Sequence, residues 1–432
     1  MIRKYGIKII ILLFVAQLGY GQTTLKSLSL DKAYELLENR YPSLKDSGVL
    51  KEIHEKEQSK LNRNRLPEIY LKAEAKGQSE TPSIDLAPGT ALPFEMDLPL
   101  YSAKSYVELL YNIYDGGMNN ANRKVKELQL KADLQNIEVD RYALKERVNQ
   151  LFVNMAILRE QNKLFDISLN DLLERKKSVT AATEEGTLLE SEVAKISVKE
   201  LELKAEKDNV NFKLLGVTNT LSMLLGVELT ENVELKFPTF SDPSHIPNIN
   251  RPEQKLFQLK QEAILANADL IDASRIPKLS AFAQGGIGYP NPLNFFDNNT
   301  ANYGIIGLRF NWKFYDWGKG SLDNEVLELQ AKRLQNARET FEFNLKTREA
   351  NYLAELTRLQ KQQASDKEIA KLQAEILEQL AFQFDEGVIT SAEYITQVNA
   401  ELKARQNILI HETVLLKLQL DFWNERGGFN EN

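Results

Sequence analysis

The chain of 432 residues contains no cysteine and only three histidines, His54, His245 and His411. The absence of cysteine excludes disulfide frameworks, thiolate metal sites and cysteine nucleophiles. The three histidines are far apart in the sequence, and none lies in a motif typical of a metal site or a catalytic triad. We therefore expect no enzymatic activity, no cofactor and no bound metal ion.

Proline and glycine are also scarce, with 13 and 21 residues, which argues against a disordered or collagen-like chain. An excess of basic residues is missing as well, because 54 lysines and arginines face 61 acidic residues, for a formal net charge of −7. Nucleic-acid-binding proteins usually carry a basic surface, so we expect no nucleic-acid partner. The sequence has no apolar run of about 18 residues, so no helix is expected to span a membrane.

The first 21 residues have the pattern of a signal peptide. Basic residues Arg3, Lys4 and Lys8 precede an apolar run over residues 9–18, and small residues follow it, ending at Gly21. The run is shorter than the roughly 20 residues of a spanning helix, which favours cleavage after Gly21 over a membrane anchor. We expect the chain to be exported by the segment from Met1 to Gly21.

The remaining sequence repeats itself at an offset of about 201 residues, lengthened to 210 at the first marker because the loops differ. Three short motifs return in the same order: Arg65-Leu66-Pro67 as Arg275-Ile276-Pro277, Asp115-Gly116-Gly117 as Asp316-Trp317-Gly318, and Glu185-Gly186 as Glu386-Gly387. A repeat this long indicates a duplicated unit rather than a solenoid, whose periods are about 20–50 residues.

Each half is predicted to contain a helix, two strands joined by a long loop, an Asp-x-Gly turn, a very long helix, a Glu-Gly turn and another long helix. The expected organisation is a signal peptide (1–21), a first structural repeat (22–225), an equatorial linker region rich in proline and polar residues (226–250), a second structural repeat (251–425) and a short tail (426–432).

The long helices carry heptads. No proline or glycine lies between Asn119 and Glu184, and apolar residues recur there at spacings of three, four and seven: Leu130, Leu134, Ile137, Leu144, Val148, Leu151, Met155, Leu158, Phe165, Leu169 and Leu172. This pattern predicts supercoiled helices. A filament also shows heptads, but the turns at Glu185-Gly186 and Glu386-Gly387 favour antiparallel hairpins.

The strand segments alternate between apolar and polar residues, which places the two kinds on opposite faces of a sheet. The apolar set that we expect to face lipid consists of Leu109, Tyr111, Ile113, Leu308, Phe310 and Trp312. A soluble, half-buried sheet shows the same alternation. The export signal, and helices that supply no obvious cover for the sheet, favour strands of a membrane β-barrel.

Four strands cannot close a barrel that faces lipid, because open strand edges are not tolerated in hydrocarbon. The smallest membrane barrels have about eight strands, so the chain must associate with further copies. Three copies would supply twelve strands, although the edge argument alone does not fix the number of copies.

Several stretches, in this order, resemble the TolC family of outer-membrane efflux proteins over residues 25–425. They are Leu28-Ser29-Leu30-Asp31-Lys32-Ala33 with Tyr41-Pro42-Ser43-Leu44, Arg251-Pro252-Glu253, Ile276-Pro277-Lys278-Leu279, Phe314-Tyr315-Asp316-Trp317-Gly318, and Gly387-Val388-Ile389-Thr390 with Glu393-Tyr394.

The resemblance implies a mainly α-helical chain with a membrane β-barrel portion. A long antiparallel coiled-coil α-barrel would continue from four strands per chain, and a homotrimer would close a 12-strand barrel. The protein would be an outer-membrane channel extending into the periplasm of a Gram-negative cell. It would serve as the exit duct of a tripartite efflux or type I secretion system, with a periplasmic membrane-fusion adaptor and a proton-driven or ATP-driven inner-membrane pump. The alternative is an exported structural coiled-coil protein without channel activity.

The candidate site is at the two predicted helical tips. The residues expected to gate the entrance are Glu184, Glu185, Glu192, Phe384, Asp385, Glu386 and Glu393, and those expected to dock onto the adaptor are Gly186, Leu188, Gly387, Val388 and Ile389. In the family, an acidic residue six positions after the first tip glycine helps to close the entrance, and Glu192 matches it. Phe384 and Ile389 occupy positions of an aromatic and a basic gate residue. Because Phe384 lacks a hydroxyl and Ile389 lacks a charge, closure is expected to rest on apolar packing.

Overall fold

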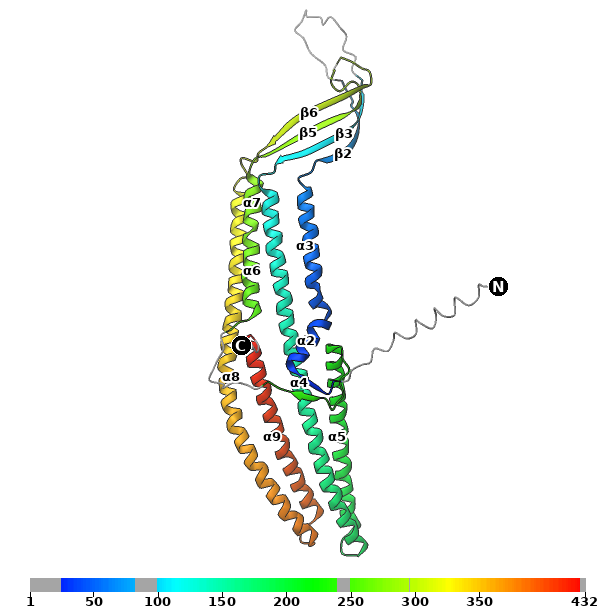
Figure 1. Cartoon of the computed structure of the whole chain (residues 1–432), viewed down its shortest axis with the longest axis vertical. Coiled ribbons are helices and arrows are strands. Elements are labelled where there is room, and N and C mark those ends of the chain that lie inside the picture. The colour runs from blue at the N-terminus through cyan, green and yellow to red at the C-terminus, as the bar shows by residue number, and fades with distance from the viewer. Residues whose placement is uncertain (1–24, 82–98, 239–248, 295, 428–432) are drawn as a thin grey trace, which may run out of the picture. The chain divides into compact units, whose positions relative to one another are not determined.

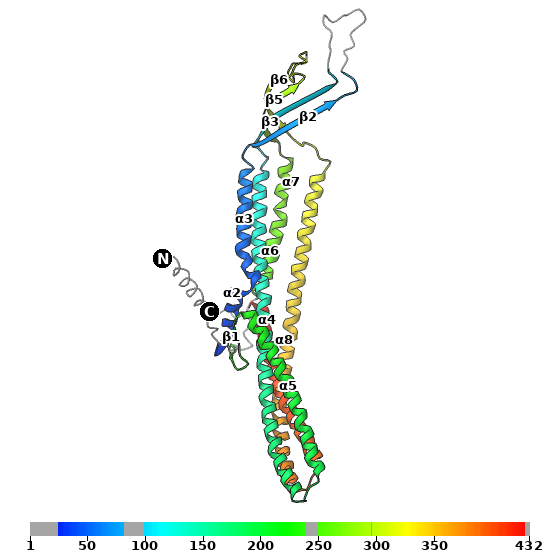
Figure 2. The same cartoon turned by 90° about the vertical axis from the view of Figure 1, so that its right-hand side faces the viewer.

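A computed structural model describes residues 25–81, 99–238, 249–294 and 296–427 of the chain. The predicted signal peptide (1–21), His245, part of the predicted linker region and the end of the predicted tail lie outside these ranges. Figures 1 and 2 show the described residues as long helices and a small number of strands.

Two pairs of long helices confirm the predicted duplication of helical elements. Helix α4 (Met118–Glu184) and helix α8 (Lys319–Asp385) each have 67 residues, and α5 (Glu190–Leu225) and α9 (Ser391–Arg426) each have 36. The first and last residues of α8 and α9 are those of α4 and α5 shifted by 201 positions. In the described part of the chain, no helix is both long enough and apolar enough to cross a membrane.

The chain divides into two compact units. Unit 1 contains Met1–Asp46, Ile137–Gln254 and Thr340–Asn432, and unit 2 contains Ser47–Asn136 and Lys255–Glu339. Each unit therefore takes residues from both predicted repeats. The boundaries of the repeats along the sequence remain a prediction.

The core of unit 1 is built from the heptad positions. Val148 and Met155 of α4 are completely buried, and Leu172 is 1% exposed. Near the helical tips the core cluster combines all four long helices, with Phe165 from α4, Ile196 from α5, Phe384 from α8 and Val398 from α9 among its members. The apolar residues at the heptad positions therefore pack between the two hairpins as well as within each hairpin.

Unit 1 also contains a two-stranded parallel sheet, which the sequence did not lead us to expect. Strand β1 (Ser27–Ser29) pairs with β4 (Glu234–Lys236), which lies in the predicted linker region. Helix α2 (Leu30–Arg40) follows β1 directly and is capped by the hydroxyl of Ser29, which accepts from Lys32 N at 3.2 Å. A short 3₁₀ helix, η1 (Pro42–Lys45), leads into α3 (Asp46–Arg63).

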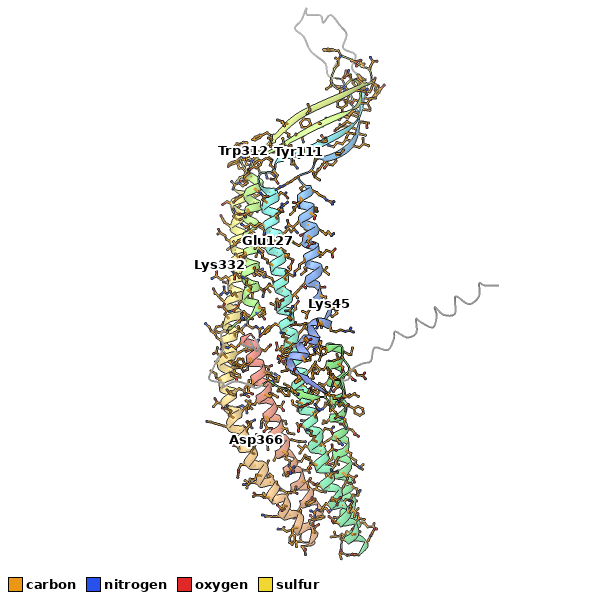
Figure 3. The ribbon with its side chains drawn as sticks, in the orientation of Figure 1. Lys45, Tyr111, Glu127, Trp312, Lys332 and Asp366 are labelled. Atoms are coloured by element: carbon orange, nitrogen blue, oxygen red, sulfur yellow. The ribbon has the colours of Figure 1, made fainter. Side chains whose placement is uncertain are left out.

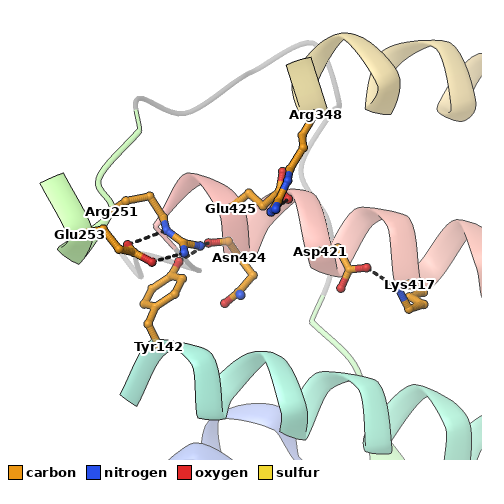
Figure 4. A network of polar contacts seen from close by, with 8 residues as sticks. All are labelled: Tyr142, Arg251, Glu253, Arg348, Lys417, Asp421, Asn424 and Glu425. Atoms are coloured by element: carbon orange, nitrogen blue, oxygen red, sulfur yellow. Dashed lines mark hydrogen bonds and ion pairs between the residues drawn. The ribbon is translucent and has the colours of Figure 1, made fainter. Parts of the chain in front are cut away.

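A polar joint connects the beginning of α6 (Pro252–Leu265) with the end of α9 (Figure 4). Arg251 Nε donates to Glu253 Oε2 at 2.9 Å, and the guanidinium carbon lies 4.5 Å from the centre of the Tyr142 ring. Arg251 Nη1 also donates to the backbone oxygen of Asn424 at 3.4 Å. Burial raises the pKa of Tyr142 to about 12. The Arg251-Pro252-Glu253 motif therefore contacts α4 through Tyr142 and the end of α9 through Asn424.

Unit 2 contains a four-stranded antiparallel sheet in the order β2-β3-β5-β6. Its strands are β2 (Glu68–Gly77), β3 (Tyr101–Tyr114), β5 (Lys278–Tyr289) and β6 (Ala301–Asn311). Helix α7 (Asn267–Arg275) precedes β5. Strands β2 and β6 pair with only one neighbour each, so both edges of the sheet are open.

The sheet has one apolar face and one polar face, as predicted. Ile69, Leu109, Ala283 and Ile306 are in register across the four strands on the apolar face. Its side chains are well exposed, with Ile306 at 86% and Leu308 at 69%. Of the predicted lipid-facing residues, Leu109, Tyr111, Ile113, Leu308 and Phe310 are exposed residues of β3 and β6.

The opposite face carries ion pairs instead. Glu108 in β3 pairs with Lys72 and accepts from Gln284 Nε2 at 2.7 Å. Glu74 pairs with Lys76 at 2.7 Å and with Lys104 at 3.1 Å. One face of the sheet is therefore suited to an apolar environment and the other to water.

One strand ends earlier than expected. The alternation predicts a strand through Phe314, but β6 ends at Asn311, which pairs with Lys278 at the start of β5. The residue before Lys278 is Pro277, which has no N–H to donate, so the ladder stops there. Trp312 consequently lies beyond the strand, where its indole N–H donates to the backbone oxygen of Arg275 at 3.2 Å. Figure 3 labels Trp312 there, and Tyr111 near the end of β3.

Candidate functional site

Both predicted tip turns are present and have the same backbone geometry. Gly186 and Gly387 adopt left-handed conformations, with φ of +77° and +72°. In the first turn, Thr187 N donates to Ala182 O at 2.9 Å and Gly186 N to Thr183 O at 3.0 Å. The equivalent bonds close the second turn at 2.9 and 3.1 Å. This is the Schellman arrangement, in which glycine supplies the left-handed residue that ends a helix.

The helices that follow the turns begin differently. Thr390 caps α9, and the Glu393 carboxylate accepts a hydrogen bond from Thr390 N at 2.9 Å, which completes a capping box. At the corresponding start of α5 the capping position is Leu189, which has no side-chain acceptor. Glu192, the counterpart of Glu393 in the duplication, is therefore not used to cap its own helix.

Glu192 instead reaches the other hairpin. Its Oε2 accepts from Ser391 N, the first backbone N–H of α9, at 2.9 Å. Its Oε1 lies 2.8 Å from Lys195 Nζ. The hydrogen bond from Lys195, followed by those from Ser391, lowers the pKa of Glu192 below its usual 4.5. An ionised Glu192 thus ties the first hairpin to the N-terminus of α9, where negative charge is favourable.

A second link joins the hairpins through Arg175 of α4. Its guanidinium forms an ion pair with Asp385 at the end of α8 and lies 5.4 Å from the ring centre of Tyr394 in α9. The Tyr394 ring stacks on Phe384 with 5.2 Å between ring centres. Burial raises the pKa of Tyr394. We call these two links, Glu192–Ser391 and Arg175–Asp385 with Tyr394, the tip latch.

The remaining predicted residues fall into two groups. Phe384 is 2% exposed inside the core, and Leu188 and Ile389 are partly buried against that core. Glu184, Glu185, Gly186, Glu386, Gly387 and Val388 are exposed at the turns, with Val388 at 71%. Phe384, Leu188 and Ile389 therefore belong to the apolar packing between the two hairpins, beside the polar links, and their role in closing the entrance stays a prediction.

Sequence reasoning missed Arg175, Lys195 and Ser391. Arg175 and Asp385 are 210 positions apart, and no local pattern relates residues so distant. The one local signal nearby concerned a different residue, because the heptad position between Leu172 and Val179 is Lys176, which pairs with Glu200 of α5 at 2.8 Å. A charged residue within an apolar seam indicates a polar partner on a facing helix.

Comparisons with known proteins were made for sequence and for structure. No protein-family model and no curated protein matches the chain. The structure of the outer membrane protein VceC from Vibrio cholerae is similar, with a TM-score of 0.67 at 13% identity over 93% of this chain and 97% of that chain. CusC, whose structures concern folding and transmembrane channel formation, gives a TM-score of 0.69 at 12% identity, covering 94% of each chain. The open state of the Neisseria gonorrhoeae outer membrane channel MtrE gives 0.65 at 17% identity, over 92% of this chain and 89% of that chain.

These likenesses extend over nearly the whole of each chain and define the fold. The chain has the mainly helical, four-stranded fold of solved outer-membrane channel proteins, which is the TolC-type fold that its motifs resemble.

Proposed function

We propose that the protein is an outer-membrane exit duct that assembles as a homotrimer and carries solutes from the periplasm or cytoplasm to the exterior. The observation that carries this proposal is the sheet of unit 2. Its apolar face is exposed, its other face carries ion pairs, and both of its edges are open. A lipid-facing outer surface and a polar lumen are what a membrane β-barrel requires.

The open edges argue for assembly. Unpaired backbone groups on β2 and β6 would each cost several kcal/mol in hydrocarbon, so β2 of one copy is expected to pair with β6 of the next. Three copies of the four-stranded sheet make a closed barrel of twelve strands, within the observed range for outer-membrane barrels.

The tip latch is the proposed gate. Its two links and the apolar core that the four helices share hold the α4–α5 hairpin against the α8–α9 hairpin, so separating the hairpins requires both links to break and this core to open. The open state of MtrE is a property of that protein, and we expect a channel of this fold to have a device that keeps its entrance closed at rest. Polar links that form within one chain supply such a device.

The proposed partners are a periplasmic membrane-fusion adaptor at the tips and an inner-membrane pump, driven by protons or ATP, that supplies energy. The adaptor contact is expected at the turns, where Val388 and both tip glycines are exposed. We expect the pump and the adaptor to determine mainly which solute is exported.

Liposome release tests the function against the alternative of an exported structural coiled-coil protein. Purified full-length protein reconstituted into liposomes should release a trapped small solute, and breaking the tip latch with Arg175→Leu should speed that release. Retention of the solute by liposomes that contain inserted wild-type and variant protein would favour the structural alternative.

A further inference from the structure

The pairing of the strands repeats with the sequence. Strands β2 and β3 begin their pairing at Glu68–Leu110, and β5 and β6 begin theirs at Lys278–Asn311. A shift of β2 by 210 positions and of β3 by 201, the two offsets of the sequence repeat, turns every β2–β3 pair into a β5–β6 pair. The strand pairs of the two repeats therefore have the same register.

The pairing that joins the two repeats, β3 with β5, has no second copy within the described residues. The same shifts carry β3 onto β6 and β5 back onto β2, which are the two open edges of the sheet. A second copy of the chain can supply the missing pairing, because its β2 can lie against β6 of the first copy. The pairs that the shifts give between two copies are Leu308–Ala75, Arg309–Glu74 and Phe310–Ala73.

These pairs match in chemistry as well as in position. The two apolar side chains of β6 lie opposite alanines on the apolar face. On the polar face, Glu108 accepts from Gln284 within the chain at 2.7 Å, and the corresponding pair between copies is Arg309 with Glu74. Within its own chain Arg309 lies over an aromatic ring and forms no ion pair with the residues that the structure describes. A carboxylate of a second copy would give this guanidinium a charged partner.

The helices beside the sheet continue the same arrangement. Helix α3 leads into β2 and the beginning of α8 follows β6, and Figures 1 and 2 both place these helices at opposite sides of unit 2, with α4 and α6 between them. Helix α3, which the structure describes in full, has no buried residue, and Val49 is 55% exposed. The residues 210 positions after Val49 and Ile53 are Leu259 and Ala263 of α6, and each is 7% exposed. The same side of the helix is therefore buried in one repeat and open in the other.

The beginning of α8 carries a matching exposed stripe. Its apolar residues recur at heptad spacings and are Leu322, Val326 and Leu329. The residues 201 positions earlier in α4 are Ala121, which is buried, and Val125 and Leu128, which are partly buried. Both outer helices of unit 2 thus expose the side that their counterparts cover within the chain.

The charges beside the two stripes are complementary. Lys124 of α4 pairs with Asp269 of α7 at 2.8 Å, and the counterpart of Lys124 on α8 is the exposed Glu325. Helix α3 carries Lys56 and Lys60, both exposed, close to the position that corresponds to Asp269. The signs are reversed on both helices, so the attraction is kept.

We propose that neighbouring copies meet along one continuous surface, in which β6 of one copy pairs with β2 of the next with Leu308 opposite Ala75, and the exposed stripe of α8 packs against the Val49–Ile53 side of α3. The two helices run antiparallel, because α3 ends at the sheet and α8 begins there. The inference rests on the proposed function, which already requires β2 and β6 to pair, and it adds the register, the Arg309–Glu74 ion pair and the contact between helices.

The absence of cysteine makes disulfide cross-linking a direct test of the register. Leu308→Cys with Ala75→Cys places two thiols on directly opposite residues, whose Cα atoms are about 4.5–5.5 Å apart and within reach of a disulfide. Leu308→Cys with Ala73→Cys is the matched control, because diagonal neighbours on the same face are about 7–8 Å apart and out of reach. Oxidation of the full-length protein in lipid vesicles should give covalent trimers from the first pair and about tenfold fewer from the second.

Leu329→Asp tests the contact between helices. Because Leu329 is exposed in the single chain, the substitution should leave the circular dichroism spectrum unchanged. It should lower the fraction of trimer in detergent by about tenfold, since the new carboxylate would be buried between copies. Gln330→Asp is the control, because Gln330 is also exposed and points about 100° away around the helix, so its trimer should persist.

Three results separate the possible failures. Stronger cross-linking of the shifted pair, or cross-linking of neither pair in a trimer that conducts, would overturn the register and leave the proposed function intact. A trimer that is unaffected by Leu329→Asp would show that the helix stripes face water or a different protein, which would overturn the helix contact. Wild-type protein that stays monomeric in membranes would instead contradict the proposed function.

Discussion

Glu192 and Glu393 occupy the same position in the two halves of the chain but stabilise different structures. Glu393 completes the cap of its own helix, whereas Glu192 binds the first backbone N–H of the opposite hairpin. The difference follows from a single neighbouring residue, because Thr390 offers a hydroxyl where Leu189 offers none. The same position therefore caps a helix in the second half of the chain and joins the two hairpins in the first half.

The pH dependence of the gate should follow from Glu192. Because its pKa is lowered in the latched state, its stabilising contribution is complete above about 4.5 and is lost as the pH falls through the lowered value. Wild-type channels should therefore open more often below about pH 4.5. Glu192→Gln should open more often already at neutral pH, by about tenfold in the open-to-closed ratio, since it lacks the charged acceptor.

Single-channel recordings of both proteins between neutral and acidic pH provide the measurement. The relevant quantity is the difference in open fraction between the wild type and Glu192→Gln at each pH. A wild-type channel with the same open fraction as the variant at neutral pH would remove Glu192 from the latch.

The assignment of the two sheet faces predicts unequal destabilisation by the same substitution at two sites of β6. Leu308→Lys places a charge on the apolar face and should destabilise the inserted protein by about 2–4 kcal/mol near the bilayer centre. Ile305→Lys places the same charge beside Gln284 on the polar face and should cost much less. Urea unfolding in lipid vesicles measures both, and equal destabilisation would mean that the faces are assigned wrongly.

At the scale of elements, the tip turns depend on glycine. Gly387 has φ of +72°, a conformation that β-branched residues strongly resist, while no atom crowds its missing side chain. Gly387→Val should therefore reshape the turn without disturbing the packing around it. We expect export in cells to be abolished while the amount of assembled protein in the membrane is unchanged.

Gly216→Ala is the control for that substitution. Gly216 lies inside α5 with open space around it, and alanine there should be tolerated or slightly stabilising. Normal export by Gly387→Val would show that the tip turn is not the docking surface.

The elements that the sequence predicted are those with a local cause. Heptads and tip glycines marked the long helices and their ends, and the alternation in β3 and β6 marked the two faces of the sheet. The end of β6 at Asn311 was missed because it depends on Pro277, which comes directly before the partner strand β5 and has no N–H to continue the ladder. The β1–β4 pair was missed because three-residue strands leave no periodic signal. At the site, the carboxylates were predicted, but their partners Arg175 and Ser391 come from distant parts of the chain.

At the scale of the whole molecule, the open edges of the sheet predict the oligomeric state. A single copy would leave β2 and β6 unpaired, so the protein in detergent should be a stable trimer. Mass determination by light scattering, corrected for bound detergent, measures this directly. A monomer that retains its full β-structure would contradict the barrel.

The tips of such a trimer should favour cations. Glu184, Glu185 and Glu386 are exposed in the single chain, whereas Asp385 and Glu192 are paired with Arg175 and Lys195. Rings of acidic residues select cations in pores. Reversal potentials in a salt gradient should show cation preference, which Glu184→Gln with Glu185→Gln should weaken. Anion preference in the wild type would remove these carboxylates from the permeation path.

The central claim is that copies of this chain enclose a gated pore, and single-channel recording in a planar bilayer tests it most directly. Purified wild-type protein should give discrete conductance steps with a low open fraction. Arg175→Leu, which breaks the ion pair with Asp385, should raise the open fraction without preventing assembly. Membranes that contain inserted, folded protein of both kinds and yet show no conductance steps would contradict the claim.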